Sequence, residues 1–136
     1  MKELDFERIT LSITGMRAST REYELLKTDT GLLATMYDGP WLYNDEIKRE
    51  DCQLSQGIGT DRDYRKVAET LSRLGVEKWN GYSGSDPNAL DGESFSLEII
   101  LSDGRTINAH GCNAYPKHYK EFFDCLDEAV NGPMEY

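Results

Sequence analysis

The sequence has few cysteines, no long hydrophobic run and fewer basic than acidic residues, and each shortage excludes a class of protein. No apolar stretch approaches the ~20 residues that a membrane-spanning helix needs. Cys52, Cys112 and Cys125 are widely spaced, and no two of them form a Cys-x-x-Cys pair. This spacing argues against a disulfide framework and against a zinc ribbon or zinc finger.

Lysine and arginine total 15 against 25 aspartate and glutamate residues, which gives a formal net charge of −10. The mean field around such a molecule repels phosphate polyanions and anionic lipid. We therefore expect neither a nucleic-acid partner nor a membrane partner. A basic protein, a cation or a neutral small molecule is compatible with this field, although acidity also serves solubility alone.

The chain of 136 residues has the size of one domain, and we expect a single domain over 1–136. The N-terminal "MKELDFERIT" lacks the apolar run of a signal peptide, which predicts a cytoplasmic protein. A leader removed at an earlier stage would leave the same N-terminus.

The first 37 residues show the pattern of a β-meander. Ile9, Leu11 and Ile13 alternate with polar residues, which predicts a strand over about 6–14. The β-prone runs "REYELLKT" and "GLLATMY" follow, separated by a turn at 29–31. After a loop at 38–46, the charged run "IKREDCQLS" predicts a further strand, whose charge suits a sheet edge.

A helix is predicted at 61–74, with Thr60 as its cap and Gly75 as its stop. Apolar residues recur there at steps of three and four: Tyr64, Val67, Ala68, Leu71 and Leu74. The following residues 77–93 are rich in Gly, Asn, Asp and Pro and are expected to be mostly loop.

The C-terminal part predicts a hairpin and a second helix. "SFSLEIIL" alternates apolar and polar residues, and "SDGR" suits the hairpin turn. In the returning strand we expect Ile107 and Ala109 on the buried side and His110 on the other. Pro116 suits the first position of the last helix, which is expected to end at 131–133. Its inward residues would be Tyr119, Phe122, Phe123, Leu126 and Val130.

The order β-β-β-(β)-α-β-β-α predicts an α+β fold. We expect a mainly antiparallel sheet of about five to six strands, with two helices packed on one face.

The segment "HGCNAYP" at 110–116 holds the side-chain types of a cysteine hydrolase. His110 and Cys112 share a strand face, and a neighbouring histidine can activate a thiol. The structural alternative is a strand-to-helix turn in which Gly111 bends the chain and Asn113 bonds its backbone. Because the alternation points His110 away from the core, the sequence favours the turn.

The same region resembles a family of bacterial proteins to which no activity is assigned. Its pattern is Asp-Gly-x-x-Trp-x-Leu-x-Ile, a turn, then Gly-x-Asn-x-Tyr-Pro and an aromatic helix. The resemblance covers about residues 79–126. The residues that match the pattern are Asp91, Gly92, Leu97, Ile99, Gly111, Asn113, Tyr115 and Pro116. Phe95 stands where the pattern has tryptophan, and Cys112 lies outside the pattern. The resemblance implies a fold for this half of the chain and transfers no activity.

Two further kinds of site can be considered. Asp86, Asn88, Asp91 and Glu93 bring oxygen ligands together, but their spacing departs from that of an EF-hand. A zinc site of His110 and Cys112 with His118 or Cys125 lacks a recognised spacing. We therefore expect no metal site and no cofactor.

Four aromatic residues in loop-like segments are the candidate binding residues: Trp41, Tyr43, Trp79 and Tyr82. Alternatively, the tryptophans simply cover edges of the core. The sequence thus predicts a non-enzymatic binding or protein-interaction module, with a basic protein as a fitting partner. The alternative is a small thiol-dependent hydrolase that uses Cys112 and His110.

Overall fold

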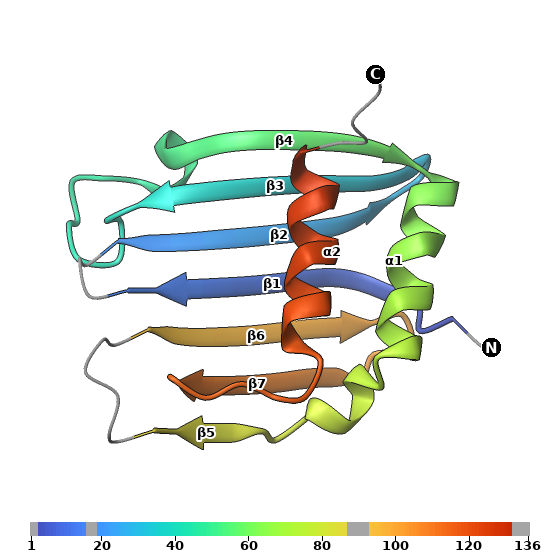
Figure 1. Cartoon of the computed structure of the whole chain (residues 1–136). Helices are drawn as coiled ribbons and strands as arrows, with labels where there is room; N and C mark the ends of the chain where they lie inside the picture. The colour runs from blue at the N-terminus through green and yellow to red at the C-terminus, as the bar shows by residue number, and fades with distance from the viewer. Residues whose placement is uncertain (1–2, 16–18, 87–92, 132–136) are drawn as a thin grey trace.

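The computed structural model describes residues 3–15, 19–86 and 93–131. A seven-stranded sheet runs in the order β4-β3-β2-β1-β6-β7-β5 (Figure 1). Neighbouring strands are antiparallel except β5, which is parallel to β7. The strands are β1 Phe6–Thr14, β2 Thr20–Thr28, β3 Gly31–Gly39, β4 Gln53–Thr60, β5 Ser83–Ser85, β6 Ser94–Leu101 and β7 Thr106–Cys112.

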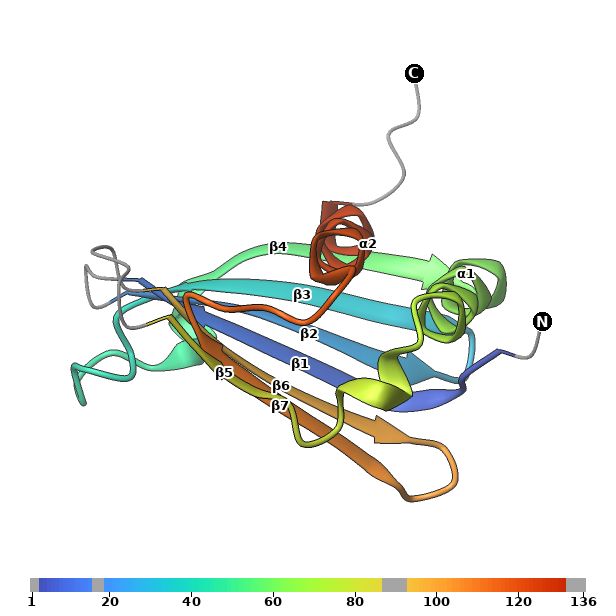
Figure 2. The same ribbon diagram turned by 60° about the horizontal axis from the view of Figure 1, so that its bottom comes forward.

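Both helices, α1 (Asp61–Arg73) and α2 (Tyr119–Asn131), lie on the same face of the sheet (Figure 2). The core fills the space between this face and the helices. It includes Ile9, Leu11, Tyr23, Leu25, Leu97 and Ile99 from the strands and Val67, Leu71, Phe122 and Leu126 from the helices. Neither helix covers the opposite face of the sheet, which we call the open face; among the described elements, only the short 3₁₀ segment η1 (Arg49–Cys52) contacts it, over the end of β3. Within the described ranges, no helix is long and apolar enough to span a bilayer.

The predicted first helix is confirmed, together with both of its ends. The Thr60 backbone N–H donates to Asp63 Oδ2 at 2.7 Å, and Thr60 Oγ1 accepts from the Asp63 N–H at 3.4 Å. This reciprocal capping box satisfies N–H groups that an isolated helix end leaves free. Gly75 then takes a left-handed conformation (φ 68°) that favours glycine and ends the helix. The short 3₁₀ segment η2 (Val76–Trp79) follows.

The fourth strand does not lie where the sequence predicted it. The charged residues form the 3₁₀ segment η1 (Arg49–Cys52), and β4 begins only at Gln53. The helix-facing positions of β4 carry Ser55, Gly57 and Gly59 in place of the apolar residues by which strands are recognised. Small residues are needed because a Cβ at Gly57 would lie 2.4 Å from the Ala129 carbonyl oxygen of α2. The edge strand was expected to be charged, but β4 contains no acidic or basic residue.

Two further predictions need correction. The sheet has seven strands where five to six were expected, because β5 forms within the predicted loop at 77–93. Serine and glycine make up β5, so no apolar alternation marks it. The last helix begins at Tyr119, three residues after Pro116. His118 takes a left-handed conformation (φ 70°), which a right-handed helix cannot include, so the helix starts only after it. The predicted helix end at 131–133 lies partly outside the described residues.

Candidate functional site

His110 and Cys112 lie together on the open face of the sheet. Along β7 the buried residues alternate with exposed ones, so that Ile107 and Ala109 face the helices and His110 faces away. The predicted orientation of this strand is therefore confirmed. Neither the imidazole nor the thiol is enclosed in a dry pocket, which is the environment that tunes a catalytic pair.

The imidazole of His110 contacts a serine and not the cysteine. Its Nε2 lies 3.1 Å from Ser83 Oγ on the neighbouring strand β5. The sulfur of Cys112 instead accepts a long contact of 3.7 Å from Asn113 Nδ2. The two residues share a strand face without the hydrogen bond that would let His110 take the thiol proton.

The rest of "GCNAYP" builds the connection from β7 to α2. Asn113 takes a left-handed conformation (φ 56°) and ties the chain to Glu93 by two hydrogen bonds. Its N–H donates to the Glu93 carbonyl at 2.8 Å, and its Oδ1 accepts from the Glu93 N–H at 3.0 Å. Gly111 is required because a Cβ there would lie 2.3 Å from the Ala114 carbonyl oxygen. These contacts give the segment a structural role.

Tyr115 and Tyr119 close an aromatic cluster at this end of the sheet. The Tyr115 ring stacks on Phe95, with centroids 5.4 Å apart, and lies 4.6 Å from the Tyr119 ring. Burial raises the pKa of both tyrosines, and a hydrogen bond to Glu93 adds to the rise for Tyr115. The cluster packs the N-terminal end of α2 against β6.

The four aromatic candidates do not form one surface. Trp79 is buried against Phe122, with ring centroids 5.3 Å apart, and Tyr82 packs on Phe95 near β5. Trp41 and Tyr43 lie in the connection between β3 and β4, at the other edge of the sheet (Figure 1). Only this second pair belongs to a segment with exposed apolar side chains.

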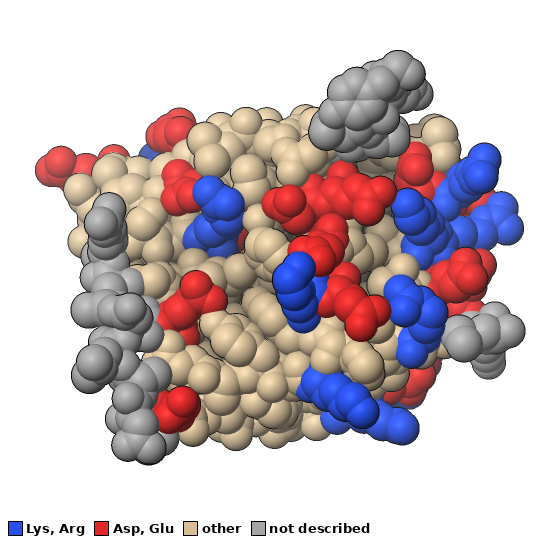
Figure 3. Space-filling model, viewed as in Figure 1, with Lys and Arg blue, Asp and Glu red and all other residues tan. Residues whose placement is uncertain are grey.

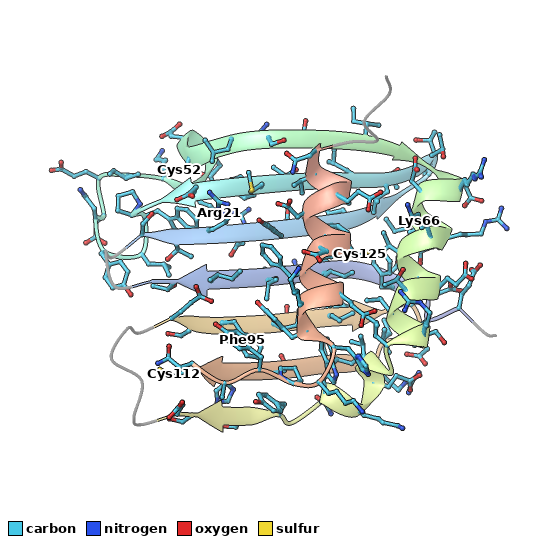
Figure 4. The ribbon with its side chains drawn as sticks, in the orientation of Figure 1. Arg21, Cys52, Lys66, Phe95, Cys112 and Cys125 are labelled. Carbon is cyan, nitrogen blue, oxygen red and sulfur yellow. The ribbon has the colours of Figure 1, made fainter. Side chains whose placement is uncertain are left out.

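The metal candidates also lie apart. Of the zinc candidates, Cys112 ends β7 and Cys125 lies in α2 (Figure 4). Both are free thiols, as is Cys52. Over the described parts of the chain, no three His, Cys, Asp or Glu side chains are placed to hold a metal ion. Asn88 and Asp91 of the calcium hypothesis lie outside the described residues.

A small cavity of about 90 Å³ lies between α1, α2 and the β3–β4 edge. Leu32, Val67 and Ala129 contribute apolar atoms to its lining, and Lys66 and Glu128 form a 3.1 Å ion pair between the two helices. Cys125 also lines it, and burial raises the pKa of its thiol (Figure 4). A raised pKa keeps the thiol protonated, so this cysteine is a poor nucleophile.

The open face carries a polar row that runs across six strands. Register aligns Tyr37, Glu22, Ser12, Ser96, His110 and Ser83 side by side. The next row holds Glu24 and Glu98 on either side of Thr10. Arg49 reaches this face from η1, pairs with Glu22 and Glu24, and lies over the Tyr37 ring. Since its acids pair with Arg49 and Arg8, the open face is close to neutral.

Residues 40–51, which we call the acidic loop, have the features of a contact surface. The chain makes consecutive turns there, with Tyr43 N–H donating to the Pro40 carbonyl at 2.9 Å and Ile47 N–H to the Asn44 carbonyl at 3.0 Å. Leu42 and Tyr43 are 60% and 62% exposed. Trp41 and Ile47 in the same loop are half-buried.

Four exposed carboxylates lie in the same loop as these apolar side chains: Asp45, Glu46, Glu50 and Asp51. Among the described residues, none of the four forms an ion pair. Of the two basic residues in the loop, Arg49 is engaged with the open face. The sequence pointed to Trp41 and Tyr43 and placed Asp45 and Glu46 in the same loop, but it assigned Glu50 and Asp51 to a strand.

Comparison of the chain with models of protein families, with curated proteins and with solved structures gave no match. Function must therefore be argued from the described geometry.

Proposed function

We propose that this protein is a non-enzymatic binding module whose acidic loop docks a basic segment of a partner protein. The observation that carries the proposal is the pair of exposed apolar side chains, Leu42 and Tyr43, among four carboxylates without an ion pair in the described structure. An apolar centre with a polar rim is the usual anatomy of a protein interface, and tyrosine is enriched there.

The chemistry of the partner follows from the charges. Unpaired carboxylates around an apolar centre repel acidic surfaces and attract lysine and arginine, which gives specificity and speeds association. The net charge of −10 acts in the same direction over longer distances. The partner segment should therefore carry several basic residues and at least one aliphatic or aromatic side chain to contact Leu42 and Tyr43.

The test is selection of random displayed peptides on the immobilised full chain. We expect enriched peptides with net positive charge and an apolar residue, and binding that weakens as salt rises from about 50 mM to about 500 mM. The double variant Leu42→Ser/Tyr43→Ser should bind these peptides at least about tenfold more weakly, which corresponds to about 1.4 kcal/mol.

The matched comparison uses two variants, each of which neutralises four acidic residues in a different part of the surface. The loop variant carries D45N, E46Q, E50Q and D51N, and the control carries E69Q, E121Q, D124N and E128Q on the helices. Both change the net charge equally, but only the loop variant should lose binding. Failure to enrich basic peptides, or equal loss in the two variants, would refute the proposal.

A further inference from the structure

The outer edge of β4 differs from the rest of the molecular surface in its lack of charge. Its sequence, "QLSQGIGT", contains no acidic or basic residue in a chain where 29% of residues are charged. In the described structure β3 pairs with one side of β4, and no strand pairs with the other. Proteins usually protect such an edge with lysine, glutamate or proline, because its free N–H and C=O groups can pair with another strand.

Two large apolar side chains of β4 are exposed: Ile58 on the open face, and Leu54 at the register irregularity between Gln53 and Ser55. Ile58 is 80% exposed and Leu54 is 61% exposed, which makes them part of the small set of exposed large hydrophobic residues. Ile58 also ends an apolar row, because it pairs with Leu33, which pairs with Leu26. This row stops abruptly at the sheet edge, where one more apolar residue from outside would extend it.

We propose that β4 pairs antiparallel with β4 of a second copy of this chain, joining two sheets into one across a two-fold axis. An acidic molecule with a net charge of −10 can approach its own copy most easily where no charge is present. A two-fold axis beside Gln56 places Leu54 of each copy opposite Ile58 of the other. Cross-strand apolar pairs of this kind stabilise a sheet.

The charges at the two ends of β4 favour the antiparallel direction. Glu50 and Asp51 precede β4, and the first turn of α1, which follows it, holds Arg62 between Asp61 and Asp63. Asp61 pairs with Arg65 and Asp63 caps the helix, which leaves Arg62 as the cation of this turn without an ion pair in the described structure. Glu50 and Asp51 also have no ion pair within the described ranges. Antiparallel pairing brings the acids of one copy toward Arg62 and the positive end of α1 in the other. Parallel pairing would bring acids beside acids.

The helix layer is compatible with this arrangement. A two-fold axis perpendicular to the sheet keeps both pairs of helices on the same side, and α1 and α2 lie wholly on one face (Figure 2). In the space-filling view, acidic side chains gather over α2, in the middle of the helix side, and basic ones gather over α1, at one end (Figure 3). The uncharged edge of β4 thus offers the approach with the least repulsion.

The first test is sedimentation velocity of the full chain from about 10 µM to about 1 mM, a range suited to a small interface. We expect a rise in mean mass toward that of a dimer. Ile58→Lys should weaken association at least about tenfold, because a lysine at an edge prevents pairing. Leu42→Lys is the matched control, since it places the same charge at an equally exposed leucine of the acidic loop and should leave the dimer unchanged.

These two variants separate this inference from the proposed function. Ile58→Lys should keep peptide binding and lose the dimer, whereas Leu42→Lys should do the reverse. A chain that stays monomeric at about 1 mM, or an Ile58→Lys variant that associates as well as the original, would overturn the inference.

The register is tested by disulfide cross-linking under oxidised glutathione. Gln56→Cys should form a covalent dimer readily, because the two-fold axis brings the two Cβ atoms to about 5 Å. Leu54→Cys is the control on the same strand, and its two copies would lie about 13 Å apart, four residues of strand. Dimer cross-links that form equally with Leu54→Cys, or none with Gln56→Cys, would rule out this pairing.

Discussion

The guanidinium carbon of Arg49 lies 4.4 Å from the centroid of the Tyr37 ring, so that η1 is held against the open face of β3. The same side chain pairs with Glu22 and Glu24, whose side chains are only 12% and 17% exposed. These contacts position the C-terminal end of the acidic loop. The exposed apolar residues of the loop are therefore presented by an anchored segment.

We predict that Arg49→Ala lowers the free energy of unfolding by about 2 kcal/mol. The variant removes a cation–π contact and leaves two mostly buried carboxylates side by side without a cation. Arg65→Ala is the control, because its ion pair with Asp61 is more than half exposed to water and should contribute little to stability. Urea denaturation of the two variants measures the difference. Equal losses would mean that Arg49 does not anchor the loop.

A second prediction concerns the contact between β4 and α2. Gly57→Ala should destabilise the protein by about 1–3 kcal/mol, because the new Cβ meets a backbone oxygen of α2 and the helix must shift. Gly15→Ala is the matched control, since nothing described lies within 4 Å of a Cβ there. Thermal unfolding of both variants tests the prediction. A Gly57→Ala variant as stable as the control would show that α2 can move away from β4 without cost.

The same contact explains why sequence patterns located some elements and not others. The strands β1 and β6 were predictable, because apolar residues on their helix-facing side alternate with polar ones. The strands β2 and β3 were predictable as β-prone runs on either side of a turn. In β4 the corresponding positions hold Ser55, Gly57 and Gly59, since α2 and α1 approach too closely for larger side chains. In β5 the pairing with β7 is made by the backbone of serine and glycine. Where backbones pack closely, the residues are small, and the sequence shows no alternation of apolar and polar residues.

In the candidate site, too, some features could be predicted from the sequence and others could not. The orientation of His110 was predictable, because the period of two in β7 fixes it. Its partner Ser83 was not, because parallel pairing of β5 with β7 joins residues 27 positions apart without any local signal. Likewise, Trp41 and Tyr43 were found by residue type, while the place of Glu50 and Asp51 required knowledge of where η1 ends and β4 begins.

Five tyrosines give the protein a predicted sensitivity to alkali. Their pKa values are all raised, with burial as the largest cause in each: Tyr23, Tyr37, Tyr64, Tyr115 and Tyr119. A folded-state pKa above the unfolded value of about 10 stabilises the fold fully below that pH. This stabilisation is lost as the pH rises through the folded values.

We therefore expect the urea midpoint to fall progressively above about pH 10, while tyrosinate absorbance rises together with unfolding. Tyr23→Phe should lessen the fall, because it removes one buried hydroxyl that donates to Asp127 Oδ1 at 3.0 Å. The variant also loses this hydrogen bond and should be somewhat less stable near neutral pH. A midpoint that does not change between about pH 9 and about pH 11 would contradict the prediction.

The last prediction decides between a passive and a reactive thiol at Cys112. Iodoacetamide should modify Cys112 slowly near pH 6.5, because His110 is not placed to take the proton of its thiol. His110→Ala should leave the rate unchanged, because the imidazole bonds Ser83 at 3.1 Å and makes no described contact with the sulfur. Peptide mapping by mass spectrometry separates Cys112 from the less exposed Cys52 and Cys125. Rapid modification of Cys112 that is abolished in His110→Ala would support a thiol-dependent hydrolase, since only an imidazole acting on the sulfur could produce both results.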